Sequence, residues 1–187
     1  SKMKGKIIIL NGPSSAGKTT LAYALQAELD EIYYRLSADD FMKMVDRQKM
    51  HDNFFVRLGE TLTIMHHTIK LFSDWGLNVI VDHVLLETPE EKFTTPEIVS
   101  LLNQYPVMFI RVDCDLLELE RRERERGDRQ LGQAKWQLEN MHSHDTYDLK
   151  INTFRQNTNE SVRQIANLLN QPDKWSAFNN LYKRFTK

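Results

Sequence analysis

Residues 9–25, "ILNGPSSAGKTTLAYAL", place a glycine-rich turn between an apolar run and a segment with helical periodicity. The turn matches G-x-x-x-x-G-K-[ST], the P-loop or Walker A pattern, at every fixed position. Its glycines permit backbone angles that side chains oppose, so several backbone N–H groups can converge on phosphate oxygens. We therefore predict that a nucleotide's phosphates bind this turn, at Gly12, Pro13, Ser14, Ser15, Ala16, Gly17, Lys18, Thr19 and Thr20.

Two of these side chains and a later acid predict a magnesium site. Lys18 is expected to reach the β- and γ-phosphates, and Thr19 to ligate Mg²⁺. Asp82 ends the apolar run "NVIVD" (78–82), and an acid at the carboxyl end of a parallel strand lies beside such a loop. It is expected to hold Mg²⁺ through water, and Asp113, after "FIRV" (109–112), is the alternative.

The rest of the chain alternates short apolar runs with helix-length segments. Helical segments with apolar stripes occupy residues 17–29, 59–75 and 159–169. Strands that alternate with helices predict an α/β fold, in which helices cover both faces of a parallel sheet. The apolar runs that predict strands lie at 6–10, 32–36, 77–81, 107–112 and 149–153.

Length and composition predict a single domain over residues 1–187. Beyond Pro172, apolar residues at helical spacing predict a C-terminal helix at about 173–186, docked on the domain rather than kept for a partner. The only cysteine, Cys114, cannot form an intrachain disulfide and is expected in the core.

The charge balance and the apolar runs exclude several classes of protein. The formal net charge is −1, so no basic field favours nucleic acid or a membrane surface. The longest apolar run, "IIIL" (7–10), is far too short to span a membrane. The first six residues, "SKMKGK", lack the apolar stretch of a signal peptide. We therefore expect a cytoplasmic protein.

Two acids follow the second predicted strand, in "LSADDF" (36–41). Asp39 and Asp40 fall at the same sheet edge as the phosphate-binding turn. A carboxylate there can orient an acceptor hydroxyl and take its proton during phosphoryl transfer. Alternatively, the two aspartates cap the helix that follows, or one residue serves each purpose.

Ten of the twelve residues in 118–129 are charged. Glu–Arg pairs four residues apart explain most of this run as a solvated helix. They do not explain Arg126 and Arg129, which flank a break at Gly127 before a second helical segment. We predict a small helical lid over about residues 115–145, whose arginines neutralise phosphoryl charge and exclude water.

Four stretches together resemble the chloramphenicol phosphotransferases and their relatives, over about residues 6–170: "ILNGPSSAGKT", "SADDF", "VIVDHVLLE" and "VDCD…RERERGDR…YDLKINT". The resemblance implies a P-loop kinase fold with a five-stranded parallel sheet. It implies transfer of the ATP γ-phosphate to a hydroxyl group. It also implies that Asp39 is the base, that Arg126 and Arg129 contact phosphate, and that Lys18, Thr19 and Asp82 occupy the phosphate and magnesium positions.

The chain departs from that family in its histidines. The family has a second acid where this chain has His83, which follows Asp82 and either contacts substrate or packs in the interior. His66 and His67 are adjacent and point in different directions on a helix, so they are expected to be structural or exposed rather than a metal site.

The segment between the predicted base and the third strand also departs from the family, because residues 42–72 are compact and rich in Met, Phe and His. In this architecture the segment builds much of the acceptor pocket. Methionine and aromatic side chains adapt to irregular ligands, so four residues either line an apolar acceptor pocket or pack in the core: Met42, Met44, Phe54 and Phe55. The loop at 153–157, with Thr153, Arg155 and Asn157, is a candidate to frame the adenine base.

These features predict a P-loop small-molecule kinase that uses ATP and Mg²⁺ and phosphorylates a hydroxyl group. Its predicted catalytic residues are Asp39, Lys18, Arg126 and Arg129, and its metal ligands are Thr19 and Asp82. One alternative is a kinase for a metabolite, a nucleoside or a polynucleotide 5′-hydroxyl. Another is a nucleotide-dependent regulatory or binding protein with slow hydrolysis. The acceptor, the oligomeric state and the choice between adenine and guanine are left open.

Overall fold

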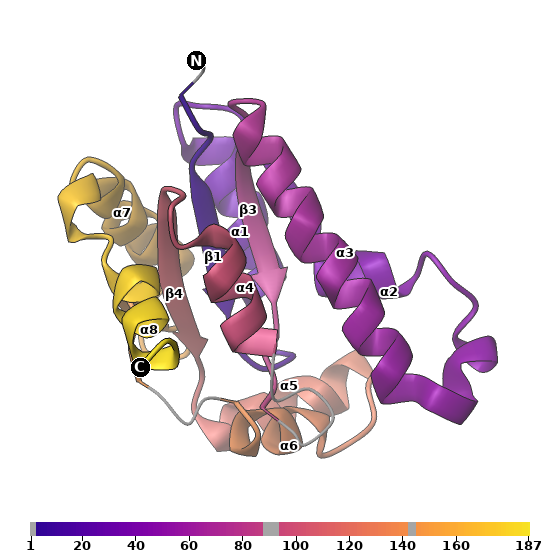
Figure 1. Cartoon of the computed structure of the whole chain (residues 1–187). Coiled ribbons are helices and arrows are strands. Elements are labelled where there is room, and N and C mark those ends of the chain that lie inside the picture. The colour runs from indigo at the N-terminus through magenta and orange to yellow at the C-terminus, as the bar shows by residue number, and fades with distance from the viewer. Residues whose placement is uncertain (1–2, 88–93, 142–144) are drawn as a thin grey trace.

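Five parallel strands form one sheet in the order β2-β3-β1-β4-β5, within the computed structural model, which describes residues 3–87, 94–141 and 145–187. The central strand β1 pairs with β3 on one side and β4 on the other (Figure 1). The sheet confirms the predicted five-stranded α/β architecture. The strands are β1 (Ile7–Asn11), β2 (Tyr33–Ser37), β3 (Asn78–His83), β4 (Val107–Asp113) and β5 (Leu149–Asn152).

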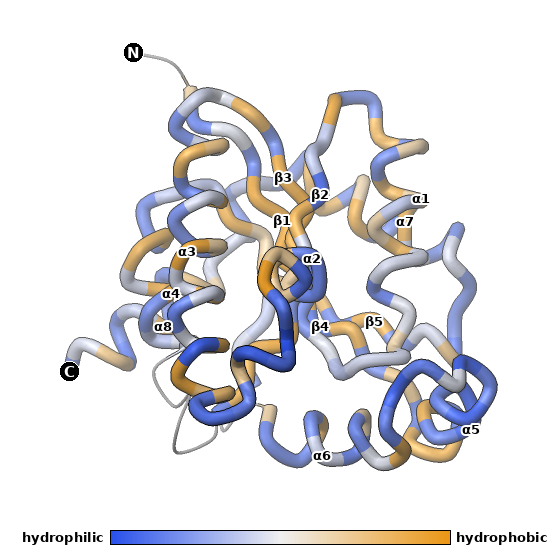
Figure 2. Tube along the Cα trace, turned by 90° about the vertical axis from the view of Figure 1, so that its right-hand side faces the viewer, coloured by the Kyte–Doolittle hydropathy of each residue, from blue (hydrophilic) through white to orange (hydrophobic). Residues whose placement is uncertain are grey.

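Helices cover both faces of the sheet, as predicted. Figure 2 shows α3, α4 and α8 on one side and α1 and α7 on the other, while α5 and α6 lie across the carboxyl ends of the strands. Among the described residues, no helix has both the length and the apolar character needed to cross a membrane. The helices are α1 (Lys18–Glu28), α2 (Ala38–Met42), α3 (Phe54–Asp74), α4 (Thr94–Leu102), α5 (Leu116–Arg126), α6 (Gln133–Glu139), α7 (Thr158–Leu169) and α8 (Ala177–Phe185), with 3₁₀ turns η1 (Arg47–Asn53) and η2 (Pro172–Lys174).

Two apolar clusters, one on each face, account for the continuous apolar runs of the strands. Alternate residues of β1 point to opposite faces, and each of its apolar residues is fully buried. Ile7 and Ile9 pack with the α3–α4–α8 side, whereas Ile8 and Leu10 pack with the α1–α7 side. Cys114 is buried in the second cluster, and burial raises the pKa of its thiol.

Asp148, which precedes β5, holds the C-terminal helix on the sheet. Its carboxylate accepts hydrogen bonds from the backbone N–H groups of Ser176 and Ala177, at 2.8 and 2.9 Å, where α8 begins. It also accepts one from the Phe109 N–H of β4, at 2.8 Å. Burial raises the pKa of Asp148, and these three N–H groups oppose that rise. One carboxylate thus joins β4 to the start of α8.

The predicted C-terminal helix is shorter than expected. The chain forms the 3₁₀ turn η2 and then α8, whose Phe178 and Leu181 are buried against the first cluster. Trp175 lies between the two elements and packs on the α1–α7 side instead, where its indole N–H donates to the Leu168 carbonyl at 2.8 Å. The predicted apolar stripe therefore divides between the two faces of the sheet.

Close backbone packing beside β1 generates a stability prediction. Gly5 donates its N–H to the Ser73 carbonyl at 2.8 Å, and the Ser73 hydroxyl donates to the Gly5 carbonyl at 2.6 Å. A Cβ atom at Gly5 would lie 1.9 Å from the Leu77 carbonyl oxygen. We expect Gly5→Ala to lower the free energy of unfolding by about 1–3 kcal/mol, measured by urea denaturation.

Gly59, inside α3, is the matched control because a Cβ atom there would meet no atom within 4 Å. Gly59→Ala should raise the free energy of unfolding by about 0.5–1 kcal/mol, since alanine loses less backbone entropy in a helix. Equal effects of the two substitutions would show that the close approach at Gly5 does not limit stability.

Candidate active site

The phosphate-binding turn joins β1 to α1 and has the backbone that the motif predicts. Gly17 begins α1 with φ of 89°, a left-handed conformation that favours glycine, and Ser15 has φ of 68°. The turn therefore directs its N–H groups and the N-terminus of α1 to the carboxyl edge of the sheet. The Gly12 N–H is held by the His83 carbonyl of β3 at 3.3 Å.

Side chains of α5, α6 and the end of β5 hold this turn from outside. The Gln137 side-chain oxygen accepts a hydrogen bond from the Ser14 N–H at 2.6 Å. Arg122 donates to the Ser15 carbonyl and to the Thr153 hydroxyl, both at 3.1 Å. Gln137 and Arg122 belong to no recognisable motif, so neither contact is predictable from the sequence. Thr153, a candidate for the adenine end, instead supports the phosphate-binding turn.

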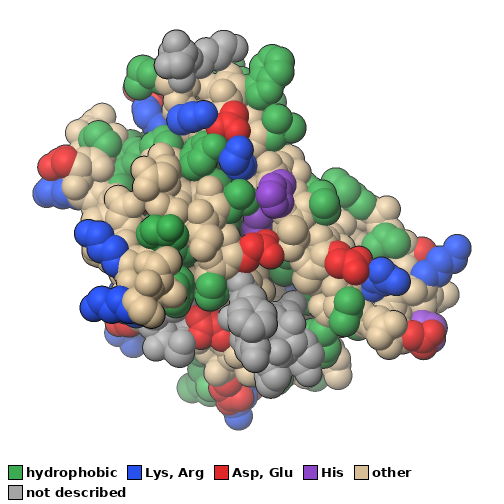
Figure 3. Space-filling model, in the orientation of Figure 1, with side chains coloured by type: hydrophobic (Ala, Val, Ile, Leu, Met, Phe, Trp, Pro, Cys, Tyr) green, Lys and Arg blue, Asp and Glu red, His purple; other side chains and the backbone are tan. Residues whose placement is uncertain are grey.

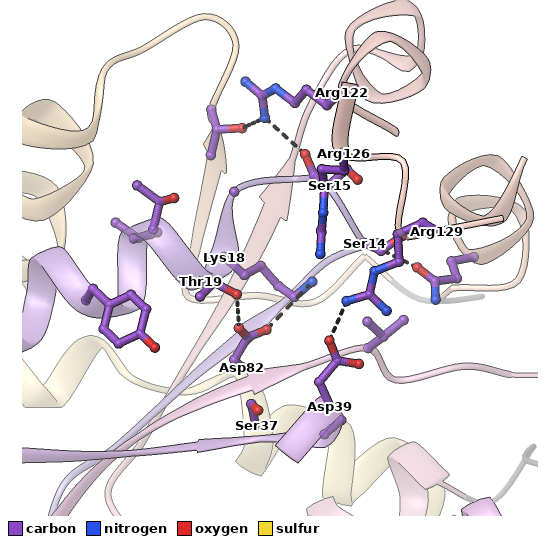
Figure 4. A pocket seen from close by; sticks show the side chains of 18 of the residues that line it. Ser14, Ser15, Lys18, Thr19, Ser37, Asp39, Asp82, Arg122, Arg126 and Arg129 are labelled. Carbon is purple, nitrogen blue, oxygen red and sulfur yellow. Dashed lines mark hydrogen bonds and ion pairs between the residues drawn. The ribbon is translucent and has the colours of Figure 1, made fainter. Parts of the chain in front are cut away.

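Asp82 lies beside Lys18 and Thr19 at the end of β3 (Figure 4). The Thr19 hydroxyl donates to one carboxylate oxygen at 2.9 Å, and the Lys18 ammonium is 3.8 Å from the other. Lys18 also donates to the Pro13 carbonyl at 3.0 Å. A hydroxyl and a carboxylate side by side suit Mg²⁺, which takes few protein ligands together with phosphate oxygens. Asp113 does not join them, because it pairs with Arg111 at 2.8 Å.

Burial controls the charge of Lys18. Its side chain is only 7% exposed, and this burial lowers the pKa of the ammonium group. The nearby carboxylates of Asp82 and Asp39 oppose that shift, while Arg129 and Arg126 add to it. A polyanion bound in the same space would raise the pKa of Lys18 and so favour its charged form.

The two acids after β2 have different partners, and neither caps α2. Ser37 is the N-cap, and its hydroxyl accepts the Asp40 N–H at 3.0 Å. Asp40 forms an ion pair with Arg35 at 3.0 Å. Asp39 forms an ion pair with Arg129, from the segment between α5 and α6 (Figure 4). The capping alternative for these side chains is therefore wrong.

The pKa of Asp39 is lowered, so this acid is a carboxylate at neutral pH. Burial opposes ionisation, but the hydrogen bond and charge of Arg129 outweigh it. The charges of Lys43 and Lys18 act in the same direction. A carboxylate in this state can accept a proton from a hydroxyl group.

Arg126 and Arg129 both point toward Lys18 and Asp82 in Figure 4. Arg126 holds Asp128 through two hydrogen bonds of 3.1 Å. Three buried polar atoms here have no hydrogen-bond partner among the described residues: Arg129 Nε, Ser14 Oγ and Ser15 Oγ. Buried polar groups are normally paired, so these atoms fit a site that takes a polyanion such as a nucleotide phosphate.

Most of the predicted site residues line one cavity of about 1080 Å³. Gly12, Pro13 and Ala16 are buried and do not line it. Residues 156–158 and Ser161 also line the cavity. Arg155 does not line it and instead pairs with Asp115 at 3.1 Å. The predicted residues that line the cavity are Ser14, Ser15, Gly17, Lys18, Thr19, Thr20, Asp39, Asp82, Arg126 and Arg129.

The predicted apolar acceptor pocket is wrong in its composition. Of its four candidate residues only Met42 lines the cavity. Met44 is 72% exposed, and Phe54 and Phe55 pack edge to face, with ring centroids 5.4 Å apart, outside the cavity lining. Residues 43–53, between α2 and α3, turn away from the sheet (Figure 1), and Phe54 and Phe55 follow them as the first residues of α3.

His83 packs in the interior rather than lining the cavity. Its Nε2 atom is 2.8 Å from Nε2 of His66 on α3, and His66 Nδ1 is 2.8 Å from a carboxylate oxygen of Glu97 on α4. Because the carboxylate accepts, His66 donates its Nδ1–H, and its Nε2 accepts from His83. Since the His83 carbonyl holds Gly12, this chain of hydrogen bonds joins α4 and α3 to the phosphate-binding turn. The spacing of residues in the sequence does not predict this contact between His66 and His83.

Several solved structures with the same architecture are kinases. The Mycobacterium tuberculosis APS kinase CysC, in complex with AMPPNP and APS, superposes with a TM-score of 0.66 at 18% identity, covering 89% of this chain and 98% of that one. Shikimate kinase from Acinetobacter baumannii, in complex with shikimate, has a TM-score of 0.62 at 15% identity, covering 90% and 95%. The fold is therefore that of the P-loop kinases, as predicted.

Sequence comparison identifies the family. Two Mycobacterium tuberculosis proteins, from strains CDC 1551 / Oshkosh and ATCC 25618 / H37Rv, are named "Putative O-phosphotransferase" MT2714 and Rv2636. Each is 29% identical over 209 residues, covering 97% of this chain and 90% of the relative. A family model described as "Chloramphenicol phosphotransferase-like protein" matches residues 5–170. The chain belongs to this family, which confirms the predicted class of a phosphotransferase with a hydroxyl acceptor.

The buried histidines generate a pH prediction. Burial lowers the pKa of both His66 and His83 in the folded chain, whereas unfolded histidine titrates near 6.5. Between these values the unfolded state binds more protons, so stability falls as pH drops below about 6.5. The free energy of unfolding should then fall with a slope that approaches about 1.4 kcal/mol per pH unit for each histidine. Urea unfolding at about pH 7.5, 6.5 and 5.5 measures it.

His66→Gln should reduce this slope, because it removes one of the two buried imidazoles. His67→Gln, on the adjacent exposed residue, is the matched control and should keep the slope of the original chain. Identical slopes in all three proteins would show that the buried pair does not set the acid sensitivity.

Proposed function

We propose that this chain transfers the γ-phosphate of ATP to a hydroxyl group of a small molecule in the cytoplasm. One observation carries the proposal: a single cavity is lined by Lys18, by the Thr19–Asp82 pair, by Asp39, and by Arg126 and Arg129. These residues supply the phosphate-binding, metal-binding, base and charge-neutralising groups that phosphoryl transfer requires. Membership of the phosphotransferase family supports the same reaction.

The turn at 12–19 would bind the phosphates together with three cations, Lys18, Arg126 and Arg129. The backbone N–H groups and Lys18 would hold the β- and γ-phosphates, with the two arginines on the far side. Thr19 and Asp82 would hold Mg²⁺, which neutralises phosphate charge when bound. Most of the catalysis is then positioning and electrostatic stabilisation within a partly closed cavity.

Asp39 is the proposed base. The acceptor oxygen forms a bond to the γ-phosphorus, the bond to the bridging β,γ-oxygen breaks, the hydroxyl proton passes to Asp39, and ADP leaves. Arg129 forms an ion pair with Asp39. A γ-phosphate competes for this arginine, so nucleotide binding would free the carboxylate for the acceptor.

The first experiment follows ADP release by the purified protein with Mg-ATP, alone and with a panel of acceptors. The panel contains chloramphenicol, nucleosides, sugars, sugar acids and 5′-hydroxyl oligonucleotides. Acceptor-dependent ADP together with a phosphorylated product supports the kinase. A slow release of ADP that no acceptor stimulates would support a nucleotide-dependent regulatory protein instead.

Asp39→Asn should lower the transfer rate by about 10²- to 10⁴-fold, because the amide cannot take the hydroxyl proton. Nucleotide binding should persist, measured with a fluorescent ATP analogue. Asp30→Asn is the control, since Asp30 is exposed and lies outside the cavity lining, and should keep the turnover. A normal transfer rate in Asp39→Asn would show that another group is the base.

Lys18→Ala should weaken nucleotide binding by roughly ten- to a hundredfold, through loss of about 1.5–3 kcal/mol of charged hydrogen bonding. Asp82→Asn should instead raise the Mg²⁺ concentration needed for half-maximal activity, because it removes a ligand charge. Fluorescent nucleotide titration with and without Mg²⁺ separates the two effects. Lys4→Ala, at an exposed lysine that pairs with Asp74 outside the cavity lining, is the control and should change neither.

A further inference from the structure

The cavity has a cationic wall beyond the phosphate-binding residues. Arg35 of β2, Lys43 after α2 and Arg47 of η1 line it around Asp39 and Asp40. Three positive charges therefore face two negative ones on the side where the acceptor hydroxyl must lie. None of these cations belongs to the P-loop or to the arginine pair already described.

Arg35 is held in place before any ligand binds. Its side chain is 16% exposed, and its guanidinium pairs with Asp40 at 3.0 Å. The same guanidinium lies 4.9 Å from the ring centroid of Tyr23, which also lines the cavity. An arginine braced by a ring and a carboxylate loses little entropy when it meets a ligand.

Lys43 and Arg47 are the other two cations of this wall, and both are exposed. Neither forms an ion pair with any residue in the described part of the chain. Arg47 is braced by Phe54, whose ring centroid lies 5.5 Å from its guanidinium carbon. Lys43 is near enough to Asp39 to lower the pKa of that acid. On the outer surface nearby, acids and bases are interspersed (Figure 3), as in the Arg57–Glu60 pair.

Coulomb energies favour an anionic ligand at this wall. Lys43 and Arg47 are both exposed, so they remain hydrated, and together with Arg35 they create a positive potential that attracts an anionic ligand and not a neutral one. An acceptor with a negative charge would be repelled by the phosphates of ATP, and these cations would offset that repulsion. Apolar residues such as Met42 and Val84 also line the cavity, and they would contact the uncharged part of the acceptor.

We propose that the acceptor is a small hydroxylated molecule with an anionic group, such as a carboxylate, sulfate or phosphate. Lys43 and Arg47 bind that group beside Arg35, while the hydroxyl faces Asp39. This inference rests on the proposed function and narrows its acceptor class.

Matched acceptors that differ in charge test it. Glycerate is compared with glycerol, and galactonate with galactitol, by measuring acceptor-dependent ADP and the phosphorylated product. We expect kcat/KM for the acids to exceed that for the alcohols by at least roughly tenfold, and to fall as ionic strength rises. Equal or better turnover of the neutral alcohols would overturn the inference.

A double variant, Lys43→Gln/Arg47→Gln, locates the anion site. The KM for the acidic acceptor should rise by at least roughly tenfold, the size of one lost charged hydrogen bond, while the KM for Mg-ATP changes less than about twofold. Lys49→Gln removes a positive charge from the same segment outside the cavity lining, so it is the matched control and should leave both constants unchanged. An unchanged acceptor KM in the double variant would overturn the assignment.

A binding measurement separates this inference from the proposed function. Protein saturated with Mg²⁺ and AMPPNP is titrated calorimetrically with each acid and each alcohol. Binding of the acids alone, abolished by the double variant, supports the anion site whether or not turnover follows. Phosphorylation of neutral alcohols alone overturns the anion site and leaves the kinase intact. Absence of both binding and turnover with every acid also overturns it.

Discussion

The pairing of β3 with β1 is the constraint on which the site depends. Their register places Leu10 opposite Asp82 and Asn11 opposite His83, and the carboxylate of Asp82 lies beside Lys18 and Thr19, where the phosphate-binding turn enters α1. The His83 side chain, on the opposite face, is tied to α3 and α4 through His66 and Glu97. A shift of one residue would exchange the two faces, burying the carboxylate and exposing the imidazole.

The second constraint is electrostatic. Lys18, Arg126 and Arg129 share one cavity, and like charges so close repel one another unless anions separate them. Without a ligand the protein supplies those anions itself: Asp82 beside Lys18, Asp128 with Arg126, and Asp39 with Arg129. Phosphates that enter must exchange for these internal partners. In the proposed mechanism, phosphate binding and the release of Asp39 are coupled for this reason, because Arg129 takes part in both.

Local patterns and long-range contacts differ in how far the sequence predicts them. Continuous apolar runs predicted all five strands to within a residue or two, and the P-loop motif predicted the turn, because both signals are local. The contacts of Gln137 with Ser14 and of His66 with His83 join distant segments through single side chains of common type. Only the packed fold shows them. The error over Phe54 and Phe55 has the same origin, since composition does not indicate which way a connecting segment turns.

The acceptor side illustrates why family membership defines the reaction better than the substrate. Phosphoryl transfer needs groups at the ends of β1, β2 and β3, which the strand order brings together, and the two arginines come from α5 and the segment after it. On the acceptor wall, Arg35 lies on β2, but Lys43 and Arg47 follow α2, where no strand pairing restricts the side chains. Arg35, Lys43 and Arg47 each resemble ordinary surface residues in the sequence. Their shared position around Asp39 makes charge, rather than apolar shape, the property that selects the acceptor.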